Sequence, residues 1–242
     1  MAVLLKHIKA YNALFRKAVG GDPFIADVKL LMHFNGNFTP SIGTATFAAD
    51  GTNFTSVNAK FDQSVNIGGN SPGGGGSNVV YSSGGTADLD INSVDFTAEG
   101  WIMQNTGATR PRTLIRFDTP SNDLIFTLVS DGPNPGQWTA AFPDTSSTTQ
   151  YIGGSNNVPG TWTYLALTRH VNDYRFFING VYIGAFTTAF RPGAGPPNVY
   201  IGNSGRAFVD ALDGLIDEIR ITVGVARYIT SFTPPSAPFP DY

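Results

Sequence analysis

The stretch that decides the fold is LDGLIDEIRITVGVARYITSFTPPSAPFPDY, residues 212–242. Within it, alternate residues from Leu215 to Ile221 form one row, which is how side chains share one face of a β-strand. The row is apolar except at Asp217, so we assign it to the core face of a sheet. Gly224 is expected to end the strand, and the prolines that follow predict an extended tail that cannot take a central sheet position. The core-facing row is Leu215, Asp217, Ile219 and Ile221, and the opposite row is Ile216, Glu218, Arg220 and Thr222.

A two-residue alternation also runs through the chain before this strand. The sequence Asn179-Gly180 separates two alternating runs and is typical of a two-residue hairpin turn, because both residues accept positive φ angles. Many short strands without helices between them predict an all-β fold, a two-sheet antiparallel jelly-roll sandwich. The predicted strands are residues 28–34, 63–67, 96–103, 112–117, 124–129, 137–142, 162–169, 174–178, 181–186 and 199–201.

Residues 2–19 have helical periodicity instead, and Gly20-Gly21 ends the pattern. Such an amphipathic helix can pack on its own sandwich, lie on a membrane surface or dock on a partner. We favour docking or oligomerisation, because only four basic residues support membrane binding. The sequence therefore predicts an N-terminal amphipathic α-helix, residues 1–21, followed by a jelly-roll domain, residues 22–242. The docking stripe is Leu4, Ile8, Tyr11, Phe15 and Val19.

Charge and cysteine content exclude several classes of protein. The net charge is −3, but residues 1–20 carry four basic residues and no acidic one, so the remainder stands at −7. An acidic body argues against nucleic acid as a partner. With no cysteine, neither a disulfide nor a thiolate metal site can form. The longest apolar run near the start, residues 2–5, is too short for a signal peptide or a membrane span, so we expect cytoplasmic synthesis without a signal peptide and no membrane partner.

Several segments together resemble, in order, the concanavalin A-like, laminin G-like jelly-roll family. The likeness covers about residues 27–242, and Asn35-Gly36 stands where the family's opening strand often ends in Asp-Gly. The ending GVARY…FTPP…PFP is similar to the version common in tailed-bacteriophage virion proteins, where such domains decorate capsids or form fibre and tail components. The segments are LLMHFNG (30–36), FTAEGWIM (96–103), WTYLALTR (162–169), YRFFINGVYIG (174–184), VYIGN (199–203) and GLIDEIRITVGVARY (214–228).

The resemblance implies a non-enzymatic virion structural protein, most simply a capsid decoration protein on the virion surface, made in the host cytoplasm. Its expected partners are capsid or other virion proteins and further copies of itself, with attachment in part through the N-terminal helix. The alternative is a lectin-like module of a fibre or tail that recognises host surface glycans. A glycan hydrolase is a distant third reading.

Catalysis is disfavoured by the arrangement of acidic residues. Hydrolase relatives of this fold alternate acidic residues along one strand, so that a nucleophile and an acid/base share a face. Here Asp88-Leu89-Asp90 is the nearest approach to that alternation, and no Glu accompanies it. His7, His33 and His170 show no spacing suited to a metal or to a nucleophile and base, so we expect ordinary polar roles. No catalytic residue and no required cofactor are predicted.

A structural calcium ion is implied only by the family resemblance. Relatives often hold calcium between an acidic residue near the end of the last long strand and oxygen groups near the first strand, and Asp217 with Asn35 matches those places. Hard oxygen ligands suit calcium. The alternative is that Asp217 accepts hydrogen bonds from backbone amides or pairs with Arg220 or another basic residue.

Three tryptophans could stack on sugars, although aromatic residues of a sandwich more often belong to the core. Trp138 follows a loop of residues 131–136 and is the candidate for an exposed glycan-binding platform. Trp101 and Trp162 are expected to be structural.

Overall fold

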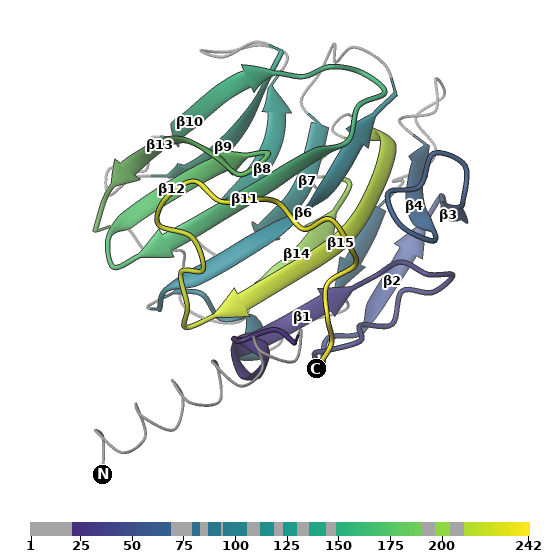
Figure 1. The fold of residues 1–242 in the computed structure, drawn as a ribbon, viewed down its shortest axis with the longest axis horizontal. Helices are drawn as coiled ribbons and strands as arrows, with labels where there is room; N and C mark the ends of the chain where they lie inside the picture. Colours follow the sequence, from purple (N-terminus) through teal and green to yellow (C-terminus); the bar gives the residue numbers. More distant parts are fainter. Residues whose placement is uncertain are drawn as a thin grey trace.

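The computed structural model describes residues 21–68, 79–82, 87–92, 94–105, 112–118, 123–129, 136–143, 149–189, 197–203 and 211–242. These residues form two antiparallel sheets that pack face to face, as Figure 1 shows. The predicted all-β sandwich is therefore confirmed. The predicted helix over residues 1–21 lies outside the described residues except for Gly21, and so do its five docking residues and His7.

One sheet has eight strands in the order β13-β12-β11-β6-β15-β4-β3, and β1 also pairs with β15. The long strand β15 (Asp213–Val223) is the centre of this sheet, because it pairs with β6 along one edge and with both β4 and β1 along the other. The other strands are β1 (Val28–Met32), β3 (Thr52–Thr55), β4 (Ser64–Gly68), β6 (Phe96–Gln104), β11 (Thr163–His170), β12 (Asp173–Ile178) and β13 (Val181–Thr187).

The other sheet has seven strands in the order β10-β9-β8-β7-β14-β5-β2. They are β2 (Phe47–Asp50), β5 (Val79–Ser82), β7 (Arg112–Asp118), β8 (Asp123–Val129), β9 (Gln137–Pro143), β10 (Thr149–Asn156) and β14 (Asn198–Ile201). Two short 3-10 helices complete the described elements, η1 (Ile25–Asp27) and η2 (Ala87–Leu89). Among the described residues, no helix has the length and apolar character needed to span a membrane.

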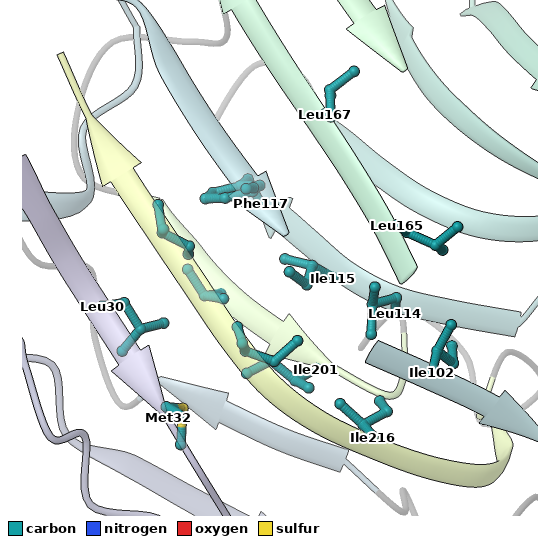
Figure 2. Packing of buried hydrophobic residues seen from close by; sticks show 14 of the residues in the cluster. Leu30, Met32, Ile102, Leu114, Ile115, Phe117, Leu165, Leu167, Ile201 and Ile216 are labelled. Atoms are coloured by element: carbon teal, nitrogen blue, oxygen red, sulfur yellow. The ribbon is translucent and has the colours of Figure 1, made fainter. Parts of the chain in front are cut away.

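The main core lies between the two sheets and draws on the inward rows of both (Figure 2). Fully buried apolar side chains meet across the gap, and their transfer from water supplies most of the driving force for folding. Those from the eight-stranded sheet include Leu30, Met32, Ile102, Leu165 and Ile216; those from the seven-stranded sheet include Leu114, Ile115, Phe117 and Ile201.

The assignment of faces along β15 is right for Ile219 and Ile221, which lie in the core, but wrong before the bulge, where Ile216 lies in the core and Asp217 does not. Glu218 has φ of 53°, in the left-handed region, and the pairing of β15 with β6 shifts register between Asp217 and Arg220. This β-bulge inserts one extra residue, so the side chains after it change faces. The core row is therefore Ile216, Ile219 and Ile221, whereas Asp217 and Arg220 lie on the outer face of the sheet.

Gly100 lies opposite the bulge and explains why β6 tolerates it. A Cβ atom at Gly100 would lie 2.4 Å from Ile219 Cδ1 and 3.3 Å from the Glu218 carbonyl oxygen. Only glycine leaves room for the bulged backbone to approach this closely. A two-residue sequence pattern contains no signal for this local change, because it assumes unbroken alternation.

The predicted hairpin at Asn179-Gly180 is confirmed, with φ of 49° and 76° at its two turn residues. The tail, residues 224–242, then passes over it: Phe232 N–H donates to the Gly180 carbonyl oxygen at 2.9 Å. Figure 1 shows the tail crossing the eight-stranded sheet on its outer face and ending beside β1. A second apolar cluster lies beneath the tail and includes Trp101, Tyr164, Phe177, Tyr228, Phe232 and Phe239.

Candidate functional site

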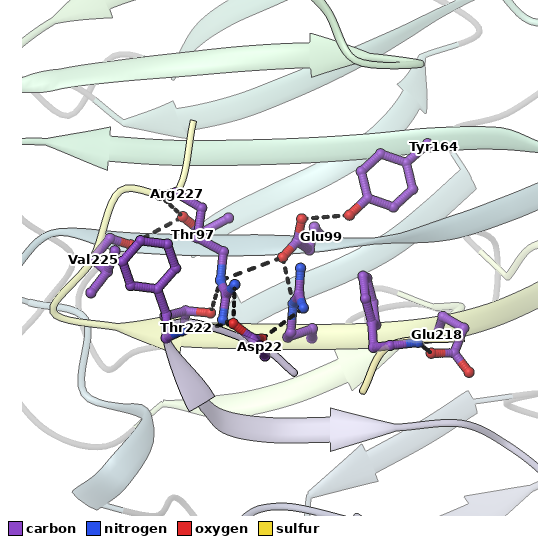
Figure 3. Close-up of polar contacts among 11 residues, drawn as sticks. Asp22, Thr97, Glu99, Tyr164, Glu218, Thr222, Val225 and Arg227 are labelled. Carbon is purple, nitrogen blue, oxygen red and sulfur yellow. Dashed lines mark hydrogen bonds and ion pairs between the residues drawn. The ribbon is translucent and has the colours of Figure 1, made fainter. Parts of the chain in front are cut away.

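Four charged side chains lie together on the outer face of the eight-stranded sheet, under the tail (Figure 3). We call Asp22, Glu99, Arg220 and Arg227 the charged seam. Arg220 donates through Nε to Glu99 Oε1 at 2.7 Å and through a terminal nitrogen to Asp22 Oδ2 at 2.9 Å. Arg227 donates to both oxygens of Asp22, each at 2.9 Å. Two guanidinium groups therefore balance two carboxylates.

The carboxylates of the seam have no free capacity for proton transfer. Tyr164 donates its hydroxyl hydrogen to Glu99 Oε2, and the Phe24 N–H donates to Asp22 Oδ1 at 2.8 Å. Burial, together with the charge of Glu99, raises the pKa of Tyr164 well above its usual range. Burial alone would raise the pKa of Asp22, but its bonds to Arg227 and the nearby guanidinium charges lower it instead. A carboxylate whose oxygens already accept hydrogen bonds beneath a tail is a poor general acid or nucleophile.

Glu218, at the bulge, joins the first strand to the tail. Its Oε1 lies 2.7 Å from His33 Nδ1, and its Oε2 accepts the Phe239 N–H at 2.8 Å. The bond to Glu218 raises the pKa of His33, outweighing the opposing effect of burial. The guanidinium of Arg220 lies over the Phe239 ring, 3.8 Å from its centroid, so the tail is held at this point by both polar and cation–π contacts.

Asp217 holds a neighbouring segment of the chain. Its Oδ2 accepts from the Phe61 N–H at 3.0 Å and from the Ser64 hydroxyl at 2.9 Å, whereas Oδ1 is buried without a hydrogen-bond partner. Burial raises the pKa of Asp217 to about 7. The expectation that Asp217 accepts backbone amides is therefore confirmed, but Arg220 pairs with other carboxylates.

The residues expected to hold calcium fit hydrogen bonding better than metal binding. Asn35 Oδ1 accepts the Gln63 N–H at 3.2 Å, so Asn35 and Asp217 both secure residues 61–64. Calcium takes about six to eight oxygen ligands. Among the residues that the structure describes, no group of three or more His, Cys, Asp or Glu side chains could hold a metal. Donors already face Asp217 Oδ2, whereas Oδ1 has no hydrogen-bond partner, and the calcium site stays a prediction.

Trp138 was expected to form an exposed platform for glycans, and this prediction is wrong. Its side chain is 1% exposed and belongs to the core between the sheets. Its position on β9 puts the ring on the inward row, and proximity to a loop in sequence did not reveal that. Among the described residues, the more exposed aromatic side chains are Tyr242, which is 62% exposed, and Tyr151 and Tyr182, each 43% exposed.

The other polar candidates have local structural roles, as expected. Thr44 Oγ1 donates to Asp88 at 3.0 Å, and Asp90 accepts the Asn92 N–H at 2.9 Å. His170 Nδ1 lies 2.9 Å from Asp95 Oδ2 at a strand end. In the described contacts, neither Asp88 nor Asp90 bonds to a group shared with a second carboxylate. These contacts therefore give no support to glycoside hydrolysis.

A pocket of about 310 Å³ lies beside the charged seam, where residue 21 enters the sandwich and the tail ends. Its walls are residues 21–24, Tyr228 and the tail residues Pro235, Pro238, Phe239 and Pro240, with Arg220 and Arg227 at one side. The sequence did not indicate this pocket, because Gly20-Gly21 was interpreted only as the end of the helical pattern and residue 22 only as the start of the jelly-roll domain. One residue of the seam, Arg227, lies within the motif that carries the family resemblance. Its place in that motif is the sequence feature that could have indicated the seam.

Comparison with known proteins identifies the fold. The family model described as the concanavalin A-like lectin/glucanases superfamily matches residues 73–225, more than half of the chain. No curated protein has a matching sequence.

Among solved structures, the binding domain of Paraclostridial Mosquitocidal Protein 1 has a TM-score of 0.62 at 12% identity, over 85% of this chain and 50% of that one. The botulinum neurotoxin serotype D ligand-binding domain, in complex with N-acetylneuraminic acid, has a TM-score of 0.62 at 9% identity, over 85% of this chain and 49% of that one. Domain 4 of AbnA, an extracellular arabinanase from Geobacillus stearothermophilus, in complex with arabinotriose, has a TM-score of 0.60 at 17% identity, over 83% of this chain and 94% of that one. The chain thus spans about half of the matched toxin domains, and these likenesses show the fold alone.

Proposed function

The chain belongs to the concanavalin A-like lectin/glucanase superfamily, and on that basis we propose that it is a non-enzymatic virion structural protein. In this proposal it is a capsid decoration protein that displays the sandwich on the particle surface. The observation that carries the proposal is the sealed outer face of the eight-stranded sheet. Glu99, Asp217 and Glu218 are each 1% exposed or less and are bonded to neighbouring groups. Carboxylates in this state leave no open acidic pair for hydrolysis.

The virion setting rests on the ending of the sequence. Arg227, Phe232 and Phe239 lie in the motif that resembles tailed-bacteriophage virion proteins, and all three hold or pack the tail on the sheet. The motif is therefore a structural unit of the sandwich. The likeness of this motif to virion proteins supports the proposal that the chain shares its architecture with domains displayed on virus particles.

The position of the chain ends supports attachment through residues 1–20. The N–H of Asp22 donates to the Tyr242 carbonyl oxygen at 3.0 Å, so the described chain begins and ends at one pole of the sandwich. We call this the terminal pole. Residues 1–20 join the described chain at this pole, and attachment through them would leave the opposite end of the sandwich free.

The proposal is tested with purified particles of the virus that encodes the chain and an antibody against the sandwich. The chain should be found in gradient-purified intact particles and should be labelled on their outside. In parallel, incubation with β-glucans, agar and bacterial surface polysaccharide should release no new reducing ends. A chain confined to the soluble lysate fraction, or turnover abolished by Asp88→Asn, would overturn the proposal.

Lectin-like recognition of glycans is the second candidate, favoured by the likeness to binding domains whose printed descriptions include sugar ligands. Since Trp138 is buried, the better aromatic contact is Tyr182, which is 43% exposed on edge strand β13 and lies 5.7 Å from the Phe177 ring. If glycans bind, Tyr182→Ala should remove the signal on a glycan array without a change in melting temperature. No glycan signal above background for the unaltered chain would end this candidate.

A further inference from the structure

The pocket at the terminal pole is shaped for an apolar occupant. Its walls are mostly aromatic and proline side chains, among them Phe24, Tyr228 and Phe239. The two guanidinium groups at its side are already paired with Asp22 and Glu99, so the occupant of the pocket does not need to carry a negative charge. A volume of about 310 Å³ is enough for large side chains rather than for a solvent molecule alone.

The chain contains a segment whose chemistry matches this pocket. Residues 1–20 hold the apolar stripe of Leu4, Ile8, Tyr11, Phe15 and Val19, which needs cover. The same segment carries Lys6, Lys9, Arg16 and Lys17 without an acidic residue, whereas residues 21–242 carry a net charge of −7. Asp241, which follows the lining residue Pro240, is exposed beside the pocket. Apolar and electrostatic terms therefore favour the same contact.

We propose that the pocket at the terminal pole receives the apolar stripe of residues 1–20 from a second copy of this chain. This inference rests on the proposed function and names the partner of its attachment segment. Gly21 is itself a pocket wall, so the segment begins at the rim of its own pocket. If the segment is helical as predicted, Phe15 lies about 9 Å beyond that rim, and the stripe leads away from it. A neighbouring copy that stands beside the first, with its terminal pole on the same side, can accept the stripe and donate its own in return.

The first test measures the mass of the full chain in solution by size exclusion with light scattering over a range of concentrations. The unaltered chain should associate, and Phe15→Asp in the stripe or Pro238→Lys in the pocket should each shift it to monomer. Pro238 is exposed, so its replacement should leave the melting temperature unchanged; Phe24→Lys is a second pocket variant. The matched control is Val158→Lys, an exposed residue whose loop bonds to Gln104 at the opposite end of β6 from the seam. Added salt should weaken the association.

Mixing the two monomeric variants then identifies the occupant. The Phe15→Asp chain retains an intact pocket and the Pro238→Lys chain retains an intact stripe, so the mixture should form a one-to-one heterodimer. A monomeric unaltered chain whose melting temperature falls equally in both variants would mean that each segment fills its own pocket, and would overturn the inference. An oligomer that persists in the pocket variants would also overturn it. These assays contain no particles, so their failure is distinct from absence of the chain from virions.

Discussion

The N–H of Asp22 donates to the carbonyl oxygen of Tyr242 at 3.0 Å, which joins the beginning of the sandwich to the end of its tail. The side chain of Asp22 meanwhile binds Arg220 from β15 and Arg227 from the tail. One residue at the start of the domain therefore fixes both the central strand and the tail that covers it. This explains how a proline-rich ending without a strand of its own remains packed on the sheet.

Loss of the Asp22 carboxylate should destabilise the protein strongly. Asp22→Ala removes the carboxylate that two buried guanidinium groups share, so that Glu99 alone must balance both Arg220 and Arg227. Removal of one member of a buried ion pair costs about 3–5 kcal/mol. Denaturant unfolding measures this change in free energy of unfolding. The control is Asp173→Ala, which breaks the partly exposed contact with Arg175 and an exposed hydrogen bond from Thr187, and should cost about 1 kcal/mol or less. Equal costs for the two variants would show that the seam is not a buried ion-pair network.

Gly180→Ala should displace the tail. A Cβ atom there would lie 2.0 Å from the Phe232 carbonyl oxygen, in addition to the strain of an L residue at φ of +76°. Gly160→Ala is the matched control, because it has φ of +73° and nothing within 4 Å of the new Cβ atom. The first variant should melt lower than the second and should be cleaved by trypsin at Arg227. Matching melting curves would indicate that the tail does not depend on this contact.

The protein should be more stable at mildly acidic pH than at alkaline pH. The bond to Glu218 raises the pKa of His33, and burial raises the pKa of Asp217 from 3.8 to about 7. A raised folded-state pKa means that the folded protein binds more protons, so stability falls as pH rises through the interval between the unfolded and folded values. Asp22, whose pKa is lowered, loses its contribution only as pH falls below about 4.

Melting temperature should therefore be higher at about pH 5.5 than at about pH 8.5. In Asp217→Asn the difference should shrink, because the buried group that gains a proton is gone. A melting temperature that rises from the acidic to the alkaline value in the unaltered chain would contradict the assigned directions of these pKa shifts.

Calcium should add no stability. Asp217 and Asn35 are occupied by hydrogen bonds to residues 61–64, and a ligand that binds only the folded state would otherwise raise the melting temperature with the logarithm of its concentration. The melting temperature in chelator and in millimolar calcium should be the same. A rise that follows calcium and is absent in Asp217→Asn would restore the metal site implied by the family resemblance.

The sequence predicts the sandwich well because alternation, turn residues and the absence of interleaved helices all act locally. The Asn179-Gly180 hairpin is an example. Strands β2, β3, β5 and β10 were missed, since they are short or rich in small and polar residues. Asp217 was assigned to the wrong face because the bulged residue between it and Ile219 breaks the alternation that had placed both on one row.

The seam could not be predicted in the same way. Asp22 and Arg227 are 205 positions apart, and nothing local to either residue indicates that the other completes it. The burial of Trp138 could not be predicted either. Closeness to a loop in sequence does not indicate on which face of β9 the ring lies.

The most direct test of the proposed display function is a cryo-electron microscopy map of the intact particle at a resolution that separates strands. The proposal predicts a sandwich on the outer surface with the pole marked by Asp22 and Tyr242 turned toward the particle. The opposite end should point to solvent. A particle whose surface carries no such density, or one in which the terminal pole points outward, would contradict it.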